Sequence, residues 1–153
     1  MSIYHDLIID HYQNPRNFGK LKNPDATARE TNASCGDVVE VQIKVTRAKS
    51  EEQKTKNKKQ KTKNKKQRTM IAEIAWQGVG CAISTAAASL LSERVSQIRQ
   101  ISQIRQISQK DMIDLLGGDI SHARIKCATL PLVALQKAIG KLETNKQNIF
   151  LVS

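Results

Sequence analysis

The sequence predicts an α+β domain in which a small antiparallel sheet has helices packed on one face. Three observations lead to this fold class: an apolar-faced helix comes first, two strands with alternating side chains follow, and two longer helical segments come after them. At 153 residues the chain has the length of one ordinary domain, so we expect residues 1–153 to form a single domain.

The first helix is predicted over residues 3–12. Ser2 can cap its beginning, and Leu7 and Ile8 share an apolar face with Ile3 and Tyr12. The helix should end before Pro15, because a residue that precedes proline disfavours the helical conformation.

Two strands are predicted from their alternation of apolar and polar side chains. Between Val39 and Val45 every second residue is Val or Ile, which is the period of a half-buried antiparallel strand. The second strand covers residues 70–76, with Met70, Ala72, Ile74 and Trp76 predicted on its buried face. The two strands would form a hairpin around the segment between them.

Two further helices are predicted after the strands. Residues 82–95 are rich in Ala and Leu, and residues 130–142 place Leu132, Leu135, Ile139 and Leu142 on one face with Pro131 near the start of the helix.

The net charge of +11 is concentrated in one segment. Residues 47–68 hold eleven Lys or Arg and two acidic residues, and a seven-residue unit beginning at Gln53 is repeated at Gln60. No apolar residue lies between Ser50 and Thr69, so we expect residues 47–69 to be a disordered basic insertion. Because the rest of the chain is nearly neutral and only 3% of residues are aromatic, nucleic-acid binding is disfavoured.

A second duplication repeats the six residues Ser-Gln-Ile-Arg-Gln-Ile at 96–101 and 102–107. Isoleucine at every third position drifts around a regular helix by about 60° per step, so the repeat does not form one apolar face. We expect a repeat-containing connector over residues 96–109, tolerated at the surface.

Several classes of function are excluded or disfavoured. No apolar run approaches the roughly 20 residues that span a bilayer, and residues 1–6 lack a secretory signal, so we expect a cytoplasmic protein without membrane contact. The sequence contains no nucleophile triad, Walker phosphate loop or Rossmann fingerprint, which argues against a conventional hydrolase or nucleotide-dependent enzyme.

The three cysteines carry the chemical signal. Cys35 precedes a predicted strand, and Cys81 and Cys127 each precede a predicted helix, where unsatisfied backbone N–H groups favour the thiolate that binds metals. Three thiolates and the carboxylate of Asp37 would complete a tetrahedral shell for zinc or for an iron in a cluster. On spacing alone, ordinary buried cysteines explain the pattern equally well, because no Cys-x-x-Cys pair is present.

Four segments resemble a known family. They are Asp10-His11-Tyr12-Gln13-Asn14-Pro15-Arg16-Asn17-Phe18-Gly19, Ala33-Ser34-Cys35-Gly36-Asp37, Gly80-Cys81-Ala82-Ile83-Ser84 and Arg124-Ile125-Lys126-Cys127-Ala128-Thr129-Leu130. In this order they resemble the signature segments of the U-type iron–sulfur cluster assembly scaffolds, the family of IscU, SufU and the N-terminal domain of NifU. The resemblance runs from about Ile3 to Ile139 and is interrupted by the two repeats.

The resemblance implies a three-stranded antiparallel sheet with helices and a surface site at one end. It implies Cys35, Asp37, Cys81 and Cys127 as ligands of a transient iron–sulfur cluster or of zinc. It further implies a scaffold for cluster assembly that receives sulfur from a cysteine desulfurase and delivers clusters to downstream acceptor proteins. An enzyme in its own right, acting as a zinc-dependent sulfurtransferase with the desulfurase, is the alternative that the same resemblance leaves open.

Departures from the pattern favour the SufU-like branch. IscU-like members of the family that this chain resembles have a histidine before the third cysteine, where this sequence has Lys126. They also have a Leu-Pro-Pro-Val-Lys segment that docks an Hsp70-type chaperone, where this sequence has Ile-Ser-His-Ala-Arg at residues 120–124. A chaperone partner is therefore disfavoured. Residues 80–84 and 124–130 also resemble the SufU-like branch. The interval between the second and third cysteines differs from that branch, which usually carries a longer insertion there, whereas here the duplication fills the interval only in part.

The sequence leaves two candidates for the cysteine that accepts sulfur. Arg124 and Lys126 flank Cys127 and favour its thiolate, and resemblance to the IscU branch also indicates Cys127. Resemblance to the SufU branch indicates Cys35 instead. His5 and His11 are predicted at the surface or an interface, and His122 in an exposed loop.

Overall fold

The computed structural model describes residues 3–34, 36–48 and 68–151. Helix α1 (Ile3–Gln13) is followed by strands β1 (Ala26–Asn32), β2 (Asp37–Ala48) and β3 (Arg68–Val79), and then by helix α2 (Ala82–Ile98). Two short helices, α3 (Ile101–Ile104) and α4 (Gln109–Leu115), and the 3-10 turn η1 (His122–Arg124) lead into α5 (Ile125–Leu151). This arrangement confirms the predicted α+β class.

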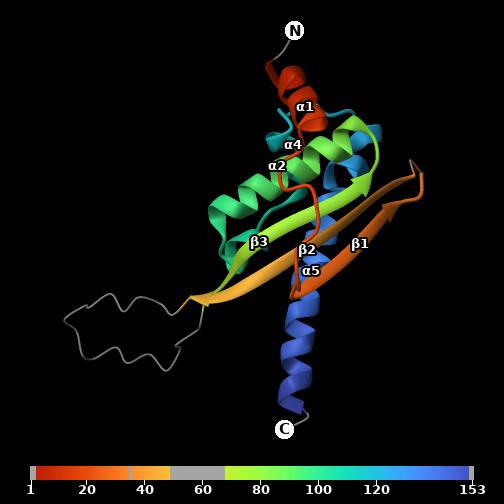
Figure 1. Cartoon of the computed structure of the whole chain (residues 1–153). Helices are drawn as coiled ribbons and strands as arrows, with labels where there is room; N and C mark the ends of the chain where they lie inside the picture. Colours follow the sequence, from red (N-terminus) through yellow and green to blue (C-terminus); the bar gives the residue numbers. More distant parts are fainter. Residues whose placement is uncertain (1–2, 35, 49–67, 152–153) are drawn as a thin grey trace, which may run out of the picture.

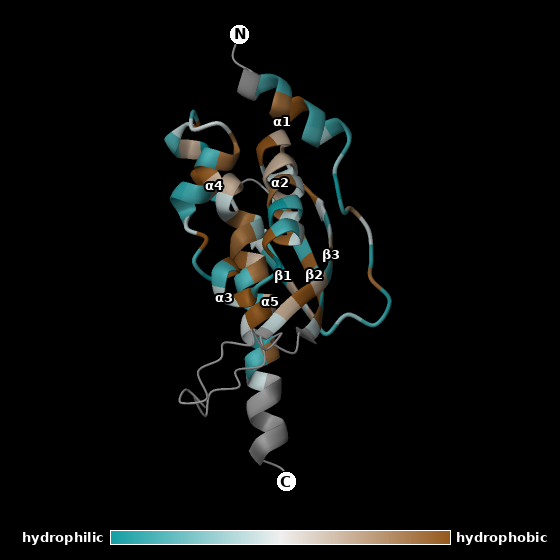
Figure 2. Cartoon of the chain, turned by 90° about the vertical axis from the view of Figure 1, so that its left-hand side faces the viewer, coloured by the Kyte–Doolittle hydropathy of each residue, from teal (hydrophilic) through white to brown (hydrophobic). Residues whose placement is uncertain are grey.

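The sheet is three-stranded and antiparallel, with β2 in the centre. Helix α5 packs against β1 and β2, and α2 packs against β3, so the sheet and the helices form two layers (Figure 1). Val39, Val41 and Ile43 of β2 are buried toward the helices, while Glu40, Gln42 and Lys44 between them stay partly exposed. Figure 2 shows the hydrophobic residues gathered between the sheet and the helices.

The predicted alternation in β3 is wrong at its first half. The register shifts between Lys44 and Val45, which face Glu73 and Ile71, so that a bulge interrupts the strand at Ala72. As a result Ile71, Ile74 and Trp76 are buried, and Ala72 is exposed.

The chain between α1 and β1 covers the outer edge of β3. The Trp76 backbone N–H donates to the Asn17 carbonyl at 3.1 Å, and Gly19 N–H donates to the Trp76 carbonyl at 2.9 Å. Phe18 lies edge-on to the Trp76 ring, with 5.0 Å between centroids. The segment then crosses the sheet to reach β1, and the paired edge of β3 is protected from pairing with other chains (Figure 1).

The last helix begins earlier than predicted. It starts at Ile125 rather than at residue 130, so Cys127 lies inside its first turn and Pro131 lies within the helix. A proline at this position has no N–H to donate to the carbonyl of Cys127, four residues before it. The helix tolerates that loss because Pro131, Leu132 and Leu135 are buried in the core.

The expectation that the duplicated segment lies at the surface is wrong for its isoleucines, although most of its Ser, Gln and Arg residues are exposed. Ile101, Ile104 and Ile107 are buried, and Ile98 is partly buried against the core. A single helix would rotate these side chains away from one another, but α2 ends at Ile98 and Arg99 takes a φ of 61°. The chain therefore changes direction after α2 and again after α3, and these turns let every isoleucine of the repeat face the core.

The predicted basic insertion covers residues 47–69. Of these, residues 47–48 and 68–69 lie in β2 and β3, and residues 49–67 lie outside the described residues. Its flanks are paired, with Ala48 opposite Arg68 at the end of the β2–β3 ladder. Of the helices that the structure describes, none has the length and apolar character needed to cross a membrane.

Candidate metal centre

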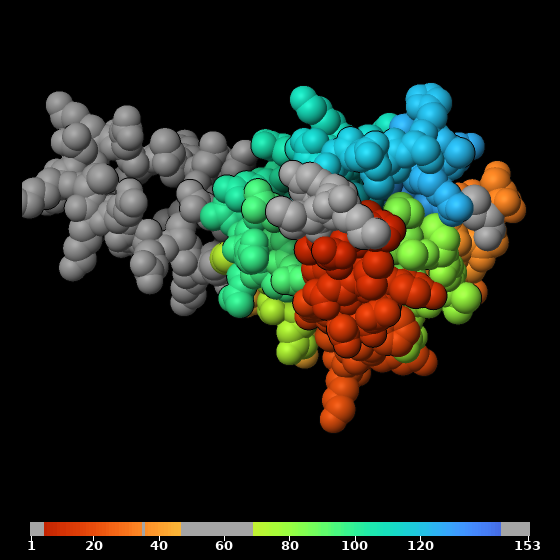
Figure 3. Space-filling model, turned by 90° about the horizontal axis from the view of Figure 1, so that it is seen from above, coloured from red at the N-terminus to blue at the C-terminus, as the bar shows by residue number. Residues whose placement is uncertain are grey.

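Three elements bring their ends together at one end of the sheet. Asp37 is the first residue of β2, Cys81 is the N-cap of α2, and Cys127 lies in the first turn of α5. Seen from above, the region where β3 leads into α2 meets the β1–β2 end and the segment around residues 120–127 on the right of the molecule (Figure 3). Residues separated by 44 or more positions along the chain thus share one site.

The ligand atoms of Asp37, Cys81 and Cys127 all lie within 4.8 Å of one another. Cys127 and Asp37 are buried, with 0% and 2% of their surface exposed, whereas Cys81 is half-buried. Cys35, the fourth predicted ligand, lies outside the described residues. The structure therefore brings together the three predicted ligands that it describes.

The carboxylate of Asp37 is held by the start of α2. The backbone N–H of Cys81 donates to Asp37 Oδ1 at 3.0 Å, and Asp37 Oδ2 lies 3.6 Å from Cys81 Sγ. Gly80 permits this approach, because a Cβ on Gly80 would lie 2.8 Å from Asp37 Oδ1 and 2.4 Å from Ser84 Oγ. The glycine before Cys81 is therefore required by the position of the carboxylate beside it.

Cys127 has a hydrogen-bond donor on its buried side. The side-chain amide of Asn32, the last residue of β1, donates to Cys127 Sγ at 3.8 Å. Sequence reasoning missed Asn32, because nothing in the local pattern relates it to a cysteine 95 residues away. The pairing of Asn32 with Asp37 across the β1–β2 hairpin, which places it at the site, becomes visible only in the structure.

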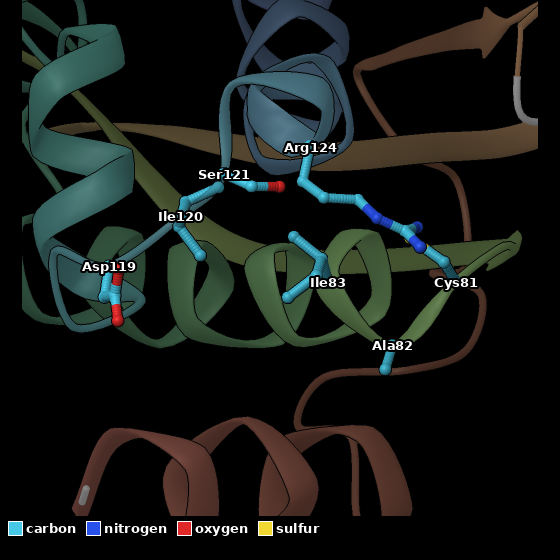
Figure 4. A pocket seen from close by; sticks show the side chains of 7 residues that line it. All are labelled: Cys81, Ala82, Ile83, Asp119, Ile120, Ser121 and Arg124. Atoms are coloured by element: carbon cyan, nitrogen blue, oxygen red, sulfur yellow. The ribbon is translucent and has the colours of Figure 1, made fainter.

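Arg124 covers the site from the solvent side. Its side chain extends toward Cys81 in Figure 4. The negative charge of a Cys81 thiolate, and then a hydrogen bond to Cys127, raise the pKa of Arg124 above its ordinary value. The predicted role of Arg124 as a cation beside Cys127 thus extends to both described cysteines.

An open groove of about 370 Å³ leads from solvent to Cys81. The side chains that line it are Cys81, Ala82, Ile83, Asp119, Ile120, Ser121 and Arg124 (Figure 4). The groove has an apolar floor, with Arg124 at the cysteine and Asp119 at the far end.

The donor set and its spacing fit a tetrahedral thiophilic metal. Zinc bonds to thiolate at about 2.3 Å and to carboxylate oxygen at about 2.1 Å, so neighbouring ligand atoms in such a shell lie roughly 3.5–3.8 Å apart. The observed upper limit of 4.8 Å is within about 1 Å of that spacing. Two thiolates and one carboxylate leave one position of a four-coordinate shell for a further ligand.

The histidines are placed differently from one another. His5 and His122 are exposed, which agrees with the positions predicted for them, whereas the surface or interface position predicted for His11 is wrong because its side chain is buried inside the fold. His11 is 4% exposed, its Nδ1 is hydrogen-bonded to Ser89 Oγ at 2.7 Å, and its Nε2 lies 3.5 Å from Glu93 Oε1. Burial, and then the nearby Arg16 charge, lower the pKa of His11, so this residue joins α1 to α2 as a neutral side chain.

A three-stranded α+β domain with two thiols and a buried carboxylate clustered at one end has the ligand set of a small metal-binding domain. The chain belongs to the NifU-like N-terminal domain family, which it matches over residues 3–148. This confirms the family predicted from the four sequence segments.

Two kinds of relative are similar to the chain. The zinc-dependent sulfurtransferase SufU of Bacillus subtilis is 31% identical over 161 residues, covering 93% of this chain and 92% of that protein. The iron–sulfur cluster assembly scaffold protein IscU 1 of Archaeoglobus fulgidus is 30% identical over 152 residues, covering 95% of this chain and 84% of that protein.

Solved structures share the fold. A NifU-like N-terminal protein from Brucella abortus superposes with a TM-score of 0.65 at 20% identity, covering 93% of this chain and 95% of that one. A SUF-system scaffold from Fervidobacterium islandicum gives a TM-score of 0.60 at 20% identity, covering 90% of this chain and 95% of that one.

Proposed function

We propose that this protein is a scaffold for iron–sulfur cluster assembly that holds its metal or cluster with Cys35, Asp37, Cys81 and Cys127. The observation that supports this proposal is the convergence of Asp37, Cys81 and Cys127 within 4.8 Å at the end of three different elements. The names of its IscU and SufU relatives point to the same kind of site.

Zinc is the metal that we propose at rest, as in the SufU-like branch. The two kinds of relative are about equally similar to the chain, so the choice depends on the site residues. An exposed lysine, Lys126, precedes Cys127 where a histidine would supply another ligand. Thiolate and carboxylate donors alone favour tetrahedral zinc, which when bound stabilises the thiolates and fixes the three elements relative to one another.

The sulfur enters by thiol–persulfide exchange with a cysteine desulfurase. A thiolate of this chain attacks the terminal sulfur of the donor persulfide, the donor S–S bond breaks, and the donor cysteine leaves as a thiolate. The acceptor cysteine then carries the persulfide without net oxidation or reduction. Iron and electrons for cluster building, and the proteins that take the finished cluster, are separate partners.

Cys127 and Cys35 remain the candidates for the acceptor. Cys127 is fully buried, so an incoming persulfide reaches it only after the side chains over it move. The burial of Cys127 supports Cys35 as the first acceptor, while the Arg124 contact supports a reactive thiolate at Cys127.

Metal and acid-labile sulfide analysis of protein purified without oxygen tests the site. We expect one zinc or one cluster per chain in the wild type, and loss of most of it in Cys81→Ser and Cys127→Ser. His122→Ala is the matched control, because His122 is exposed in the same segment and lies outside the proposed ligand set. Equal metal content in all four proteins would refute the ligand assignment.

The sulfur-transfer step is tested with a cysteine desulfurase and cysteine. We expect faster sulfide or alanine production with the wild-type chain, and a persulfide that mass spectrometry maps to Cys35 or Cys127. A chain that binds metal but leaves the desulfurase unaffected and carries no persulfide would retain only the metal-binding or cluster-binding role. Salt-sensitive binding to RNA or DNA would instead support a nucleic-acid function.

A further inference from the structure

Asn32 occupies an unusual position for a buried polar side chain. It is the last residue of β1, only 8% exposed, and it pairs with Asp37 across the β1–β2 hairpin. A buried amide must satisfy both its donor and its acceptor atoms, so its partners indicate its role.

The two ends of the Asn32 amide contact different parts of the site. Nδ2 donates to Cys127 Sγ on α5 at 3.8 Å, while Oδ1 accepts from the Ser34 backbone N–H at 3.3 Å. The Asn32 carbonyl also accepts from Gly36 N–H at 2.8 Å. Asn32 therefore connects the helix that carries Cys127 to the β1–β2 turn at Ser34 and Gly36.

We propose that Asn32 is a positioning residue of the metal centre, which orients the Cys127 sulfur and couples it to the β1–β2 turn. This inference rests on the proposed function, because it requires Cys127 to be a ligand. A thiolate bound to a metal keeps further lone pairs, so it still accepts the Asn32 hydrogen bond. That bond withdraws electron density from the sulfur, which is how outer-shell donors tune thiolate-bound metals.

A merely structural role for Asn32 makes a different prediction. The turn needs only the Oδ1 and backbone carbonyl of Asn32, and both of these bonds are made without the amide N–H. If Asn32 served the turn alone, removing its N–H donor would leave the electronic properties of Cys127 unchanged.

Cobalt(II) titration of the metal-free full-length chain separates the two roles, because the sulfur-to-cobalt charge-transfer band reports on the sulfur itself. Asn32→Asp keeps the acceptor for Ser34 N–H and lacks the donor to Cys127, and Asn32→Ala lacks both. Thr31→Ala is the control, because Thr31 is the exposed neighbour in the same strand. Urea unfolding of each protein checks that the fold is retained.

We expect the charge-transfer band to move to longer wavelength in Asn32→Asp and Asn32→Ala and to stay in place in Thr31→Ala. Asn32→Ala should also bind cobalt and zinc about 10–100-fold more weakly, the usual effect of losing an outer-shell partner. The band of Asn32→Ala is the decisive readout, because the added negative charge of Asn32→Asp attracts cations and also shifts the sulfur band by itself.

Two negative results have different meanings. Cobalt binding by the wild type, with an unshifted band in both Asn32 variants, would overturn the role of Asn32 and leave the proposed function intact. A wild-type chain without any charge-transfer band on cobalt addition would overturn the proposed thiolate site, and the inference with it.

Discussion

Gly80→Ala perturbs the centre by adding a single methyl group. The new Cβ would lie 2.4 Å from Ser84 Oγ and 2.8 Å from Asp37 Oδ1, whereas ordinary contacts begin near 3.4 Å. Ser84 and Asp37 would therefore have to retreat by about 1.0 Å and about 0.6 Å. Both side chains are buried, so neither can turn into solvent, and overpacking of this kind costs about 1–3 kcal/mol of unfolding free energy.

The same displacement moves the carboxylate relative to the two sulfurs. We expect Gly80→Ala to bind zinc about 10–100-fold more weakly, because ligands held off their geometry lose affinity by such factors. Urea unfolding of the metal-free protein measures the first effect, and competition with a zinc chelator measures the second.

Gly140→Ala is the matched control for this prediction. Gly140 lies in α5, and a Cβ added to it would meet no other atom within 4 Å outside its own helix backbone and chain neighbours. The substitution should therefore keep zinc affinity and raise stability by up to about 1 kcal/mol. Wild-type zinc affinity in Gly80→Ala, together with a measured loss of stability, would refute the reasoning that the fixed position of Asp37 matters for the metal.

Three other perturbations give independent checks. Replacing residues 49–67 with an Asn-Gly turn should leave the zinc content unchanged, because the 12-residue β2 separates that end of the hairpin from Asp37 by about 35 Å. Loss of zinc would show that the insertion supports the site. The pKa of His11 is lowered in the folded chain, so below about pH 6.5 the unfolded chain binds a proton at His11 more readily than the folded chain does, and the unfolding free energy should fall as the pH drops. His11→Gln should flatten that part of the pH profile. An unchanged profile would contradict a neutral, buried His11. Ile104→Ala should lower the free energy of unfolding by about 2–5 kcal/mol, measured with urea, because Ile104 is fully buried. Ser102→Ala in the same repeat should change it little, because Ser102 is exposed. Equal effects would mean that the duplicated segment does not contribute to the hydrophobic core.

The elements with a strong local signal were predictable from sequence. Strand β2 follows from its alternating valines, and α2 follows from its Ala and Leu content. β1 gave no such signal, since its sequence is Ala-Thr-Ala-Arg-Glu-Thr-Asn, and the expectation of a third strand came only from the family resemblance. Pairing with β2 and packing against α5 supply the stability that the residues of β1 lack on their own.

The errors have a common physical origin in tertiary contacts. The bulge at Ala72 and the end of α2 before Arg99 each change which side chains face the core. A prediction that assumes a constant strand or helix period along the segment cannot detect either change. His11 is buried because Ser89 and Glu93 on α2 meet its ring, a pairing across 78 residues that its own helix does not reveal. The contact between Asn32 and Cys127 could not be predicted for the same reason, because the two residues are 95 positions apart in the sequence.

Access to the centre differs among its described ligands, and this difference constrains the proposed sulfur transfer. Asp37 and Cys127 are buried and each is hydrogen-bonded to another part of the fold, whereas Cys81 is half-buried and lines the open groove. A partner that delivers sulfur to Cys127 from this groove must displace the guanidinium of Arg124, which contacts both cysteines. The same guanidinium attracts an anionic persulfide, so Arg124 both covers the thiols and favours the approach of the group that must replace it.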